Sequence, residues 1–147
     1  MSEKKIRNIF YQGPIPADKI AADLQQHASN TDIGAHSIFI GQVRADQKET
    51  DSVAAIEYTA YPEMALEKMA EIRADLFIRY PLTCMHVHHS LGRVNIGEIC
   101  LFVFVSSKHR KAAMDACEAM VEAIKKELPI WGKEICSNDA EYWKQNK

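Results

Sequence analysis

Hydrophobic residues recur along the chain at two spacings, which separate the expected helices from the expected strands. Apolar side chains at steps of three and four predict a helix over residues 62–80: Leu66, Met69, Ile72, Leu76 and Tyr80. Pro62 occupies the favoured first helical position and Pro81 ends the segment. The same spacing predicts helices at 17–28 and 108–128, the last burying Ala113, Ala116, Cys117, Met120, Val121 and Ile124.

Shorter apolar runs between these helices predict β-strands at residues 6–11, 35–44, 53–60, 84–91 and 98–107. Ile38, Phe39 and Ile40 are consecutive and therefore apolar on both faces, which predicts a strand buried in the centre of a sheet. Polar residues 45–52 and turn-rich residues 92–97 separate strands. Helices that follow strands predict one α+β domain over residues 1–147, a two-layer arrangement of a mixed sheet packed with helices.

Composition narrows the class of protein. A chain of 147 residues that is 47% hydrophobic suits one core, and its net charge of −2 lacks the basic field of a nucleic-acid binder. No apolar run approaches the roughly 20 residues of a membrane span, and the charged residues 1–5 are unlike a secretory signal. The cysteine spacing fits reduced thiols in a cytoplasmic protein better than a disulfide framework: Cys84, Cys100, Cys117 and Cys136.

Basic residues lie at both ends of the helix expected over 108–128. With Ser106 or Ser107 as the N-cap, His109 and Arg110 fall in the first turn. Cations there oppose the helix dipole at a cost of roughly 0.3–1 kcal/mol, and a bound anion would reverse the sign of that cost. The pair is therefore a candidate anion site, with solvated charge as the alternative.

Lys125 follows the buried Ile124 and should lie at the edge of the apolar stripe. Partial burial lowers the pKa of an amine, as a lysine requires to act as a base or nucleophile near neutral pH. Lys126 points about 100° further round the helix and is the expected bystander. His109 lies about 24 Å from Lys125 along the axis, so either only one basic cluster is functional or the site is composite. We expect the composite site in a homodimer, with His109 and Arg110 from the second subunit.

Arg44 lies where a strand runs into a polar loop, a common place for functional residues. Gly41 permits a close backbone approach or marks a bulge. His86 and His88 would share one face of a strand, with His89 pointing away. Because no cysteine pair or H-E-x-x-H pattern accompanies these histidines, we expect no metal site.

Motifs from residue 34 to residue 131 belong together: Gly34-Ala35, Gly41-Gln42-Val43-Arg44, Tyr61-Pro62, Gly92, Gly97-Glu98, Ser107-Lys108-His109-Arg110, Lys125 and Pro129-Ile130-Trp131. In this combination the chain resembles the catalytic subunit family of molybdopterin synthase. The resemblance implies an α/β fold with a small β subdomain and a homodimer, each protomer of which binds a small ubiquitin-like sulfur-carrier subunit to form a heterotetramer. It implies sulfur transfer from the carrier's C-terminal thiocarboxylate to cyclic pyranopterin monophosphate, which forms the molybdopterin dithiolene in molybdenum cofactor biosynthesis. No metal or other cofactor is implied at this step.

The resemblance also implies residue roles. Lys125 matches the essential lysine, as acid/base or covalent anchor, and the phosphate and pterin would be held by a set of substrate-binding residues: Gln42, Val43, Arg44, His109, Arg110, Gly132 and Glu134. The family motif Pro-x-Trp-Lys-(Lys/Arg)-Glu has Gly132 at its first basic position here, and Lys133 would be the second catalytic lysine if Gly132 lets the loop turn differently. The alternative is a non-catalytic dimeric scaffold that binds the ubiquitin-like carrier.

Overall fold

In the computed structural model, which describes residues 7–146, distant parts of the chain join one seven-stranded sheet. The strands are β1 (Phe10–Gln12), β2 (Ala35–Gln42), β3 (Val53–Ala60), β4 (Leu82–Asn95), β5 (Ile99–Ser107), β6 (Ile130–Cys136) and β7 (Glu141–Trp143). Their order is β2-β5-β4-β3-β6-β7, and every pairing along this path is antiparallel. Because β1 pairs with β4 in parallel, the sheet is mixed, as predicted.

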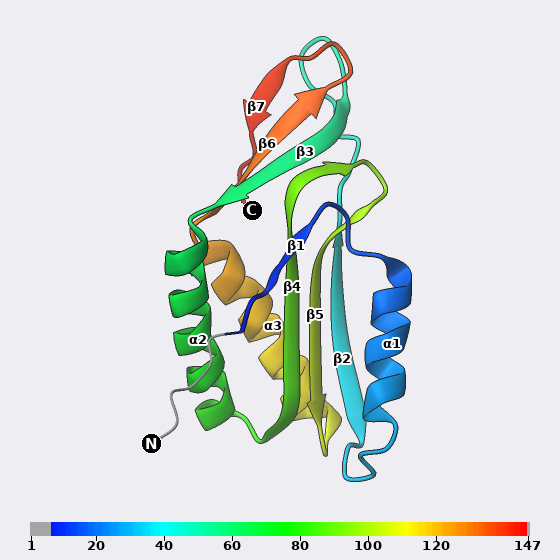
Figure 1. Ribbon diagram of the computed structural model, residues 1–147, viewed down its shortest axis with the longest axis vertical. Coiled ribbons are helices and arrows are strands. Elements are labelled where there is room, and N and C mark those ends of the chain that lie inside the picture. The colour runs from blue at the N-terminus through cyan, green and yellow to red at the C-terminus, as the bar shows by residue number, and fades with distance from the viewer. Residues whose placement is uncertain (1–6, 147) are drawn as a thin grey trace.

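The long strand β4 divides this sheet into two parts. Its first half pairs with β5, whereas its last residues, from Gly92 to Asn95, pair with β3. Strands β3, β6 and β7 thus form a small β subdomain beyond the main sheet (Figure 1). The turn expected over residues 92–97 is therefore shorter than predicted, since the strand continues through Gly92 and reverses at Ile96 and Gly97.

Three helices accompany the sheet within the described residues: α1 (Ala17–His27), α2 (Pro62–Arg79) and α3 (Arg110–Glu127). Helix α3 packs on β2 and β5, with α2 beside it, while α1 lies on the other side of the sheet (Figure 1). Alternate side chains of β5 pack on opposite faces of the sheet. Phe102 and Phe104 join Ile15 on the α1 side, whereas Val103 and Val105 belong to the larger core beneath α2 and α3.

The buried central strand is β5, and this corrects the prediction for residues 35–44. All of β5 from Cys100 to Ser107 is buried, whereas β2 lies at one end of the sheet, with Phe39 36% and Ile40 45% exposed. An apolar run indicates contact on both faces but does not say whether that contact is with the same chain.

The start of α3 also differs from the prediction. Ser106 and Ser107 lie within β5 and are buried, and the residue that precedes the helix is His109. The Ser107 hydroxyl donates to the Pro81 carbonyl (2.8 Å) and so ties β5 to the end of α2. Arg110 is then the first helical residue, and the basic pair remains at the helix N-terminus as expected.

The first predicted strand is shorter than expected, since β1 begins at Phe10; Ile6 lies outside the described residues. Strands β6 and β7 were not predicted, although they build one wall of the site described below. Pro62 begins α2 as predicted, and all four cysteines are free thiols. Within residues 7–146 no helix combines the length and the apolar character that crossing a membrane requires.

Candidate active site

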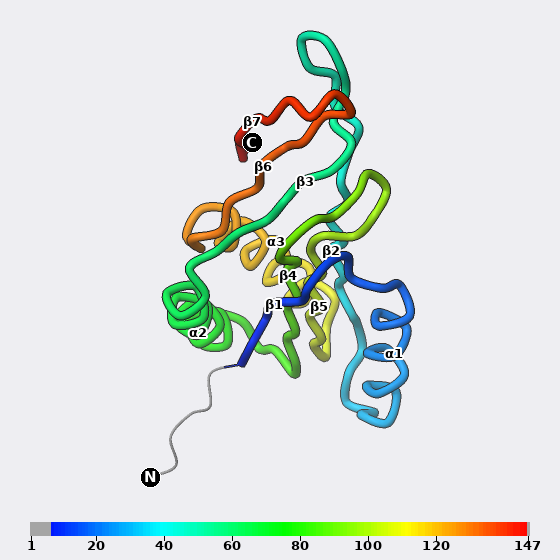
Figure 2. The backbone as a smooth tube through the Cα atoms, turned by 45° about the horizontal axis from the view of Figure 1, so that its top comes forward, coloured from blue at the N-terminus to red at the C-terminus, as the bar shows by residue number. Residues whose placement is uncertain are grey.

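A cavity of about 640 Å³ lies between β2, the small β subdomain and the C-terminal end of α3. Its charged and polar lining comes mainly from five parts of the chain: Gln42 and Arg44 at and after the β2 bulge, Asp46 and Lys48 from the loop, Lys125 from α3, Glu134 from β6, and Lys144 to Asn146 after β7. Figure 2 shows β3, β6 and β7 side by side, with the C-terminus beside β7. A volume of this size suits a small-molecule ligand.

Lys125 lies in the last turn of α3, half-buried at the cavity wall. Burial is the largest effect and lowers the pKa of its amine; the positive charge of Lys144 lowers it further, whereas Cys100 and the Glu122 carboxylate raise it in part. No carboxylate in the described residues forms an ion pair with Lys125 to offset these effects. The prediction that Lys125 is partly buried and has a lowered pKa is therefore confirmed.

Two buried neutral groups lie beside Lys125, in an adjoining pocket of about 70 Å³. The His89 ring stands edge-on to Tyr58, with the ring centroids 5.1 Å apart. Burial lowers the pKa of His89 to about 4, and its Nδ1–H donates to the Ser90 carbonyl (2.8 Å). Burial likewise raises the pKa of Tyr58. At neutral pH both side chains are therefore uncharged, and neither supplies Lys125 with a counter-ion.

Glu134 forms a buried ion pair with Lys48. The distance from Lys48 Nζ to Glu134 Oε1 is 2.8 Å, and the Glu134 side chain is 7% exposed. The hydrogen bond to Glu134 raises the pKa of Lys48. Glu134, an expected substrate-binding residue, thus lines the cavity but is already engaged in holding the loop over residues 45–52 against β6.

The segment that follows β2 brings Gln42 and Arg44 to the cavity. The ladder with β5 shifts register between Gly41 and Gln42, which confirms the bulge expected at Gly41. Arg44 forms an exposed ion pair with Asp46 (3.2 Å). Val43 does not line the cavity: its side chain is in the core, 2% exposed, and its backbone N–H donates to the Glu98 carbonyl (3.1 Å). Val43 therefore anchors the segment that presents its two neighbours.

Gly132 lies where the family pattern has a lysine, and this chain has no room for a side chain there. A Cβ atom at residue 132 would be 2.9 Å from Ile56 Cγ2 and 3.1 Å from Tyr58 Cε1. Lys133 does not replace that lysine, because it projects from β6 away from both pockets. It pairs with Glu141 (3.3 Å) and lies over the Trp143 ring.

Lys144 occupies the position across the ladder from Gly132. Its backbone N–H donates to the Gly132 carbonyl (2.8 Å), and the residue lines both the large and the small pocket. Sequence reasoning missed this lysine, since only the pairing of β6 with β7 brings it beside Lys125. The structure therefore supplies a third cavity lysine, beside Lys48 and Lys125, from the residues that follow β7.

His109 and Arg110 are exposed at the far end of α3 and are not among the cavity residues. The structure does not bring them together with Lys125 within one chain. This agrees with the argument that a single helix cannot present both basic ends to one small ligand.

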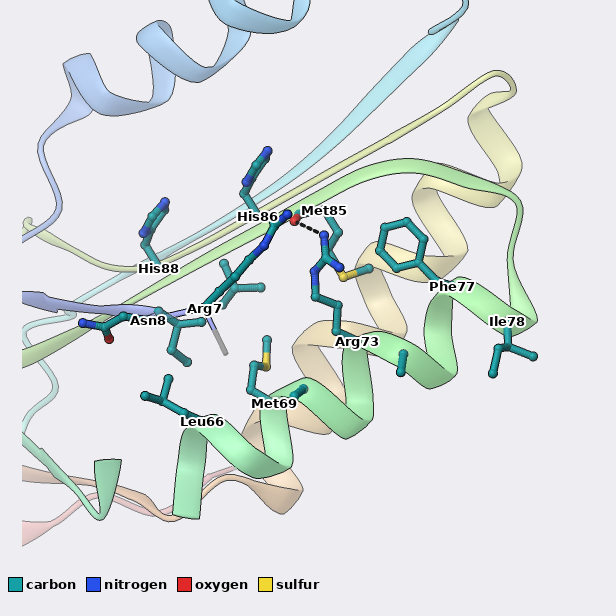
Figure 3. Close-up of a pocket in the computed structure, with 14 residues that line it drawn as sticks. Arg7, Asn8, Leu66, Met69, Arg73, Phe77, Ile78, Met85, His86 and His88 are labelled. Carbon is teal, nitrogen blue, oxygen red and sulfur yellow. Dashed lines mark hydrogen bonds between the residues drawn. The ribbon is translucent and has the colours of Figure 1, made fainter. Parts of the chain in front are cut away.

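A second cavity, of about 520 Å³, lies between α2 and β4 (Figure 3). Most of its lining is apolar, although Arg7 and Arg73 also line it, and Arg73 donates to the Met85 carbonyl (3.4 Å). No lysine lines it. The partly buried amine of Lys125 and its cationic neighbours Arg44 and Lys144 are therefore found only in the first of these two cavities.

The fold and this site define an α+β protein with a lysine-centred cavity for an anionic ligand. The family model described as "MoaE protein" matches residues 14–127. The molybdopterin synthase catalytic subunit of Pyrococcus abyssi is 36% identical over 115 residues, which cover 78% of this chain and 76% of that protein. The subunit from Bos taurus is 34% identical over 146 residues, covering 99% and 75%. The chain belongs to the family of molybdopterin synthase catalytic subunits, as its motifs predicted.

Solved structures and longer relatives agree with this assignment. The crystal structure of molybdopterin synthase from Staphylococcus aureus superposes with a TM-score of 0.81 at 31% identity, covering 98% of this chain and all of that one. A molybdopterin-converting factor complex from Helicobacter pylori shares the fold, with a TM-score of 0.77 at 22% identity over 94% and 90% of the two chains. The Drosophila mojavensis relative is 41% identical over 77% of this chain, which spans 31% of that longer protein.

Proposed function

We propose that this chain transfers sulfur from the thiocarboxylate of a small ubiquitin-like carrier to cyclic pyranopterin monophosphate and so forms the dithiolene of molybdopterin. The observation that carries the proposal is Lys125, a half-buried amine without a carboxylate partner, in a cavity of about 640 Å³. Lys48 is already paired with Glu134, and an anionic substrate would supply negative charge to the other two cavity lysines, Lys125 and Lys144.

Lys125 is the proposed catalytic residue. In each transfer the thiocarboxylate sulfur forms a carbon–sulfur bond to the substrate while a carbon–oxygen bond of the substrate breaks and its oxygen departs. Water then attacks the acyl carbon, the acyl–sulfur bond breaks, and the carrier is released as a carboxylate. The neutral amine of Lys125 takes the proton from that water, and its ammonium form returns a proton to the departing group. A lowered pKa increases the fraction of neutral amine at neutral pH, which is the form that this role requires.

Substrate binding is assigned to residues around this amine. Arg44 and Lys144 would contact the phosphate, as charged donors to anionic oxygens, and Gln42 would donate to or accept from the pterin ring. The ion pair of Lys48 and Glu134 would keep the loop beside them in place. Lys133 is not assigned a role in this scheme, because it faces away from the cavity.

The complete site is proposed to require a second copy of the chain. The partner subunit would add His109 and Arg110 to the phosphate site, which is consistent with the length of α3, since one helix cannot present both ends to one small ligand. Phe39 and Ile40 support this dimer, since they are exposed apolar residues on the end strand β2 and line the same cavity. Mixing Lys125→Ala and Arg110→Ala protomers should restore activity, because one of the two sites in a mixed dimer is intact. Failure of dimers shown to be mixed to regain activity would exclude this arrangement.

We propose that each protomer of the dimer binds one carrier, which gives a heterotetramer. The Helicobacter pylori structure is a protein–protein complex of subunits 1 and 2 of molybdopterin-converting factor, and the present chain has the same fold as its matching chain. The four free thiols agree with a reducing compartment, and we propose a cytoplasmic location.

Reconstitution tests the proposal against the scaffold alternative. The chain is incubated with thiocarboxylated carrier and cyclic pyranopterin monophosphate, and dithiolene product is quantified alongside carrier binding. Two carrier thiocarboxylates should be consumed for each product formed. A stable complex with the carrier but no product would identify a scaffold and overturn the proposed activity.

A further inference from the structure

Three potential metal ligands converge on the side of the sheet where α1 lies. They are His27 of α1 and two residues of β4, Cys84 and His86, and their donor atoms all lie within 4.8 Å of one another. Cys84 Sγ is 2.9 Å from His86 Nε2 and 3.1 Å from His27 Nε2, and the two nitrogens are 3.2 Å apart.

Local structure aims each of these atoms at a common point. Cys84 and His86 are alternate residues of one strand and therefore share its face. Figure 3 shows His86 extending from β4 toward the side of α1, where it also lines one end of the cavity between α2 and β4. His27 Nδ1–H donates to the Asp23 carbonyl (2.6 Å), so the lone pair of the neutral ring is on Nε2, which faces the cluster.

Hydrogen bonds alone leave this cluster incompletely satisfied. With His27 Nδ1–H committed to Asp23, the neutral groups offer at most two protons, on Cys84 Sγ and His86 Nε2, for three close contacts. One contact then has no proton of its own and is satisfied only if a proton is shared between two acceptors. A cation at the centre would convert all three contacts into ligand bonds.

We propose that His27, Cys84 and His86 form a binding site for a divalent transition-metal ion of the zinc type. With usual zinc–nitrogen and zinc–sulfur bond lengths, a tetrahedral ion separates two nitrogens by about 3.3 Å and a nitrogen from a sulfur by about 3.6 Å. The two nitrogens are already at this separation to within about 0.1 Å, whereas the two nitrogen–sulfur distances of 2.9 and 3.1 Å would lengthen by roughly 0.5–0.7 Å, which side-chain rotations at Cys84 would supply. Cys84 binds as the thiolate and releases its proton to solvent, and water completes the tetrahedron.

The charges around the cluster are compatible with this site. Burial lowers the pKa of His86 and the neighbouring His27 lowers it further, which keeps the ring in its neutral, metal-binding form. Asp23 is buried, and its Oδ2 has no hydrogen-bond partner among residues 7–146, so a carboxylate charge is held one helical turn from His27. Arg7 and Arg73 act on the thiol in the direction that favours the thiolate, although burial of Cys84 is the larger effect and raises its pKa.

The proposed ion would connect α1 to the sheet. The apolar contacts of this helix face a small cluster, built on Ile15, Phe102 and Phe104, so a metal bridge between α1 and β4 would add stability rather than chemistry. His89, beside Lys125, belongs to the opposite face of β4. Occupancy should therefore raise the melting temperature and leave sulfur transfer intact.

Zinc titration of the chelator-treated full chain tests the site. The wild type should retain one zinc per chain after removal of excess metal, and Cys84→Ser and His27→Gln should each weaken binding at least tenfold. His88→Gln is the matched control, because His88 lies on the same strand face but outside the cluster, and it should bind zinc as the wild type does.

Cobalt provides a second readout that identifies the ligands. Cobalt-loaded wild type should show tetrahedral visible bands and a thiolate charge-transfer band that Cys84→Ser lacks, with circular dichroism confirming that both proteins are folded. Less than stoichiometric zinc in the folded wild type, or equal uptake by the wild type, Cys84→Ser and His27→Gln, would show a hydrogen-bonded cluster only. Neither result depends on whether the chain transfers sulfur.

Discussion

Replacing Gly132 with alanine tests whether this chain has room for a side chain at the position where the family motif has a lysine. Two effects oppose each other. In an open strand the substitution would stabilise by about 0.5–1 kcal/mol, because glycine loses more conformational entropy on folding. Here the new Cβ would be 2.9 Å from Ile56 Cγ2 and 3.1 Å from Tyr58 Cε1.

The steric effect should dominate. Ile56 is β-branched and 3% exposed, and Tyr58 is 6% exposed, so neither side chain can move aside freely. Overpacking of this kind typically costs about 1–3 kcal/mol, which leaves a net destabilisation of roughly 0.5–2 kcal/mol. Gly132→Lys should be destabilised similarly and should gain no activity, since Lys144, which follows β7, already lines the cavity.

Urea unfolding followed by far-UV circular dichroism measures this effect. With a slope of about 1–3 kcal/mol per molar, a loss of about 1 kcal/mol lowers the midpoint by roughly 0.3–1 M. Lys133→Ala, at the next residue but facing away from Ile56, is the matched control and should change the midpoint little. In an Ile56→Ala background the cost of Gly132→Ala should shrink. A Gly132→Ala protein at least as stable as the wild type would refute the reasoning.

Two further predictions concern the neighbours of Lys125. His89 has a pKa of about 4 in the folded chain and an ordinary value near 6.5, so below about pH 6.5 the unfolded state binds its proton and stability falls as pH falls. From pH 7 to pH 5 this group should remove about 2 kcal/mol, and His89→Gln should lose that much less in urea unfolding over the same range; an equal loss would contradict the assignment. Lys144→Gln should raise KM for the pterin phosphate roughly tenfold, because a hydrogen bond to a charged group contributes about 1.5–3 kcal/mol. It should also move the acidic limb of the pH–rate profile to higher pH, since Lys144 lowers the pKa of Lys125. Lys126→Ala is the control for both readouts, and a Lys144→Gln protein that matches it would exclude Lys144 from the site.

The sequence predicted the helices well, because each buries an apolar stripe whose spacing is local information. It also identified Lys125 from its place beside Ile124 at the end of such a stripe. The assignment of residues 35–44 to the centre of the sheet was wrong, since Phe39 and Ile40 are apolar residues left exposed on an end strand. The spacing of apolar residues does not show whether they pack against their own chain or against another protein.

Long-range pairing explains the remaining omissions. Strands β6 and β7 are short and carry charged residues, so their apolar periodicity is weak, and Lys144 reaches the cavity only through their ladder. The cluster of His27, Cys84 and His86 was not predicted for a related reason. Cys84 and His86 share a strand face that the sequence shows, but His27 comes from a helix 57 residues before Cys84.

The measurement that tests the central claim most directly is single-turnover conversion of cyclic pyranopterin monophosphate by thiocarboxylated carrier, with Lys125→Ala and Lys133→Ala beside the wild type. The account predicts that Lys125→Ala slows product formation by about 10²–10⁴-fold while still binding the carrier. It predicts that Lys133→Ala, whose side chain faces Glu141 and Trp143, stays within a few-fold of the wild type. Turnover that survives in Lys125→Ala, or disappears in Lys133→Ala, would contradict the assignment of the site.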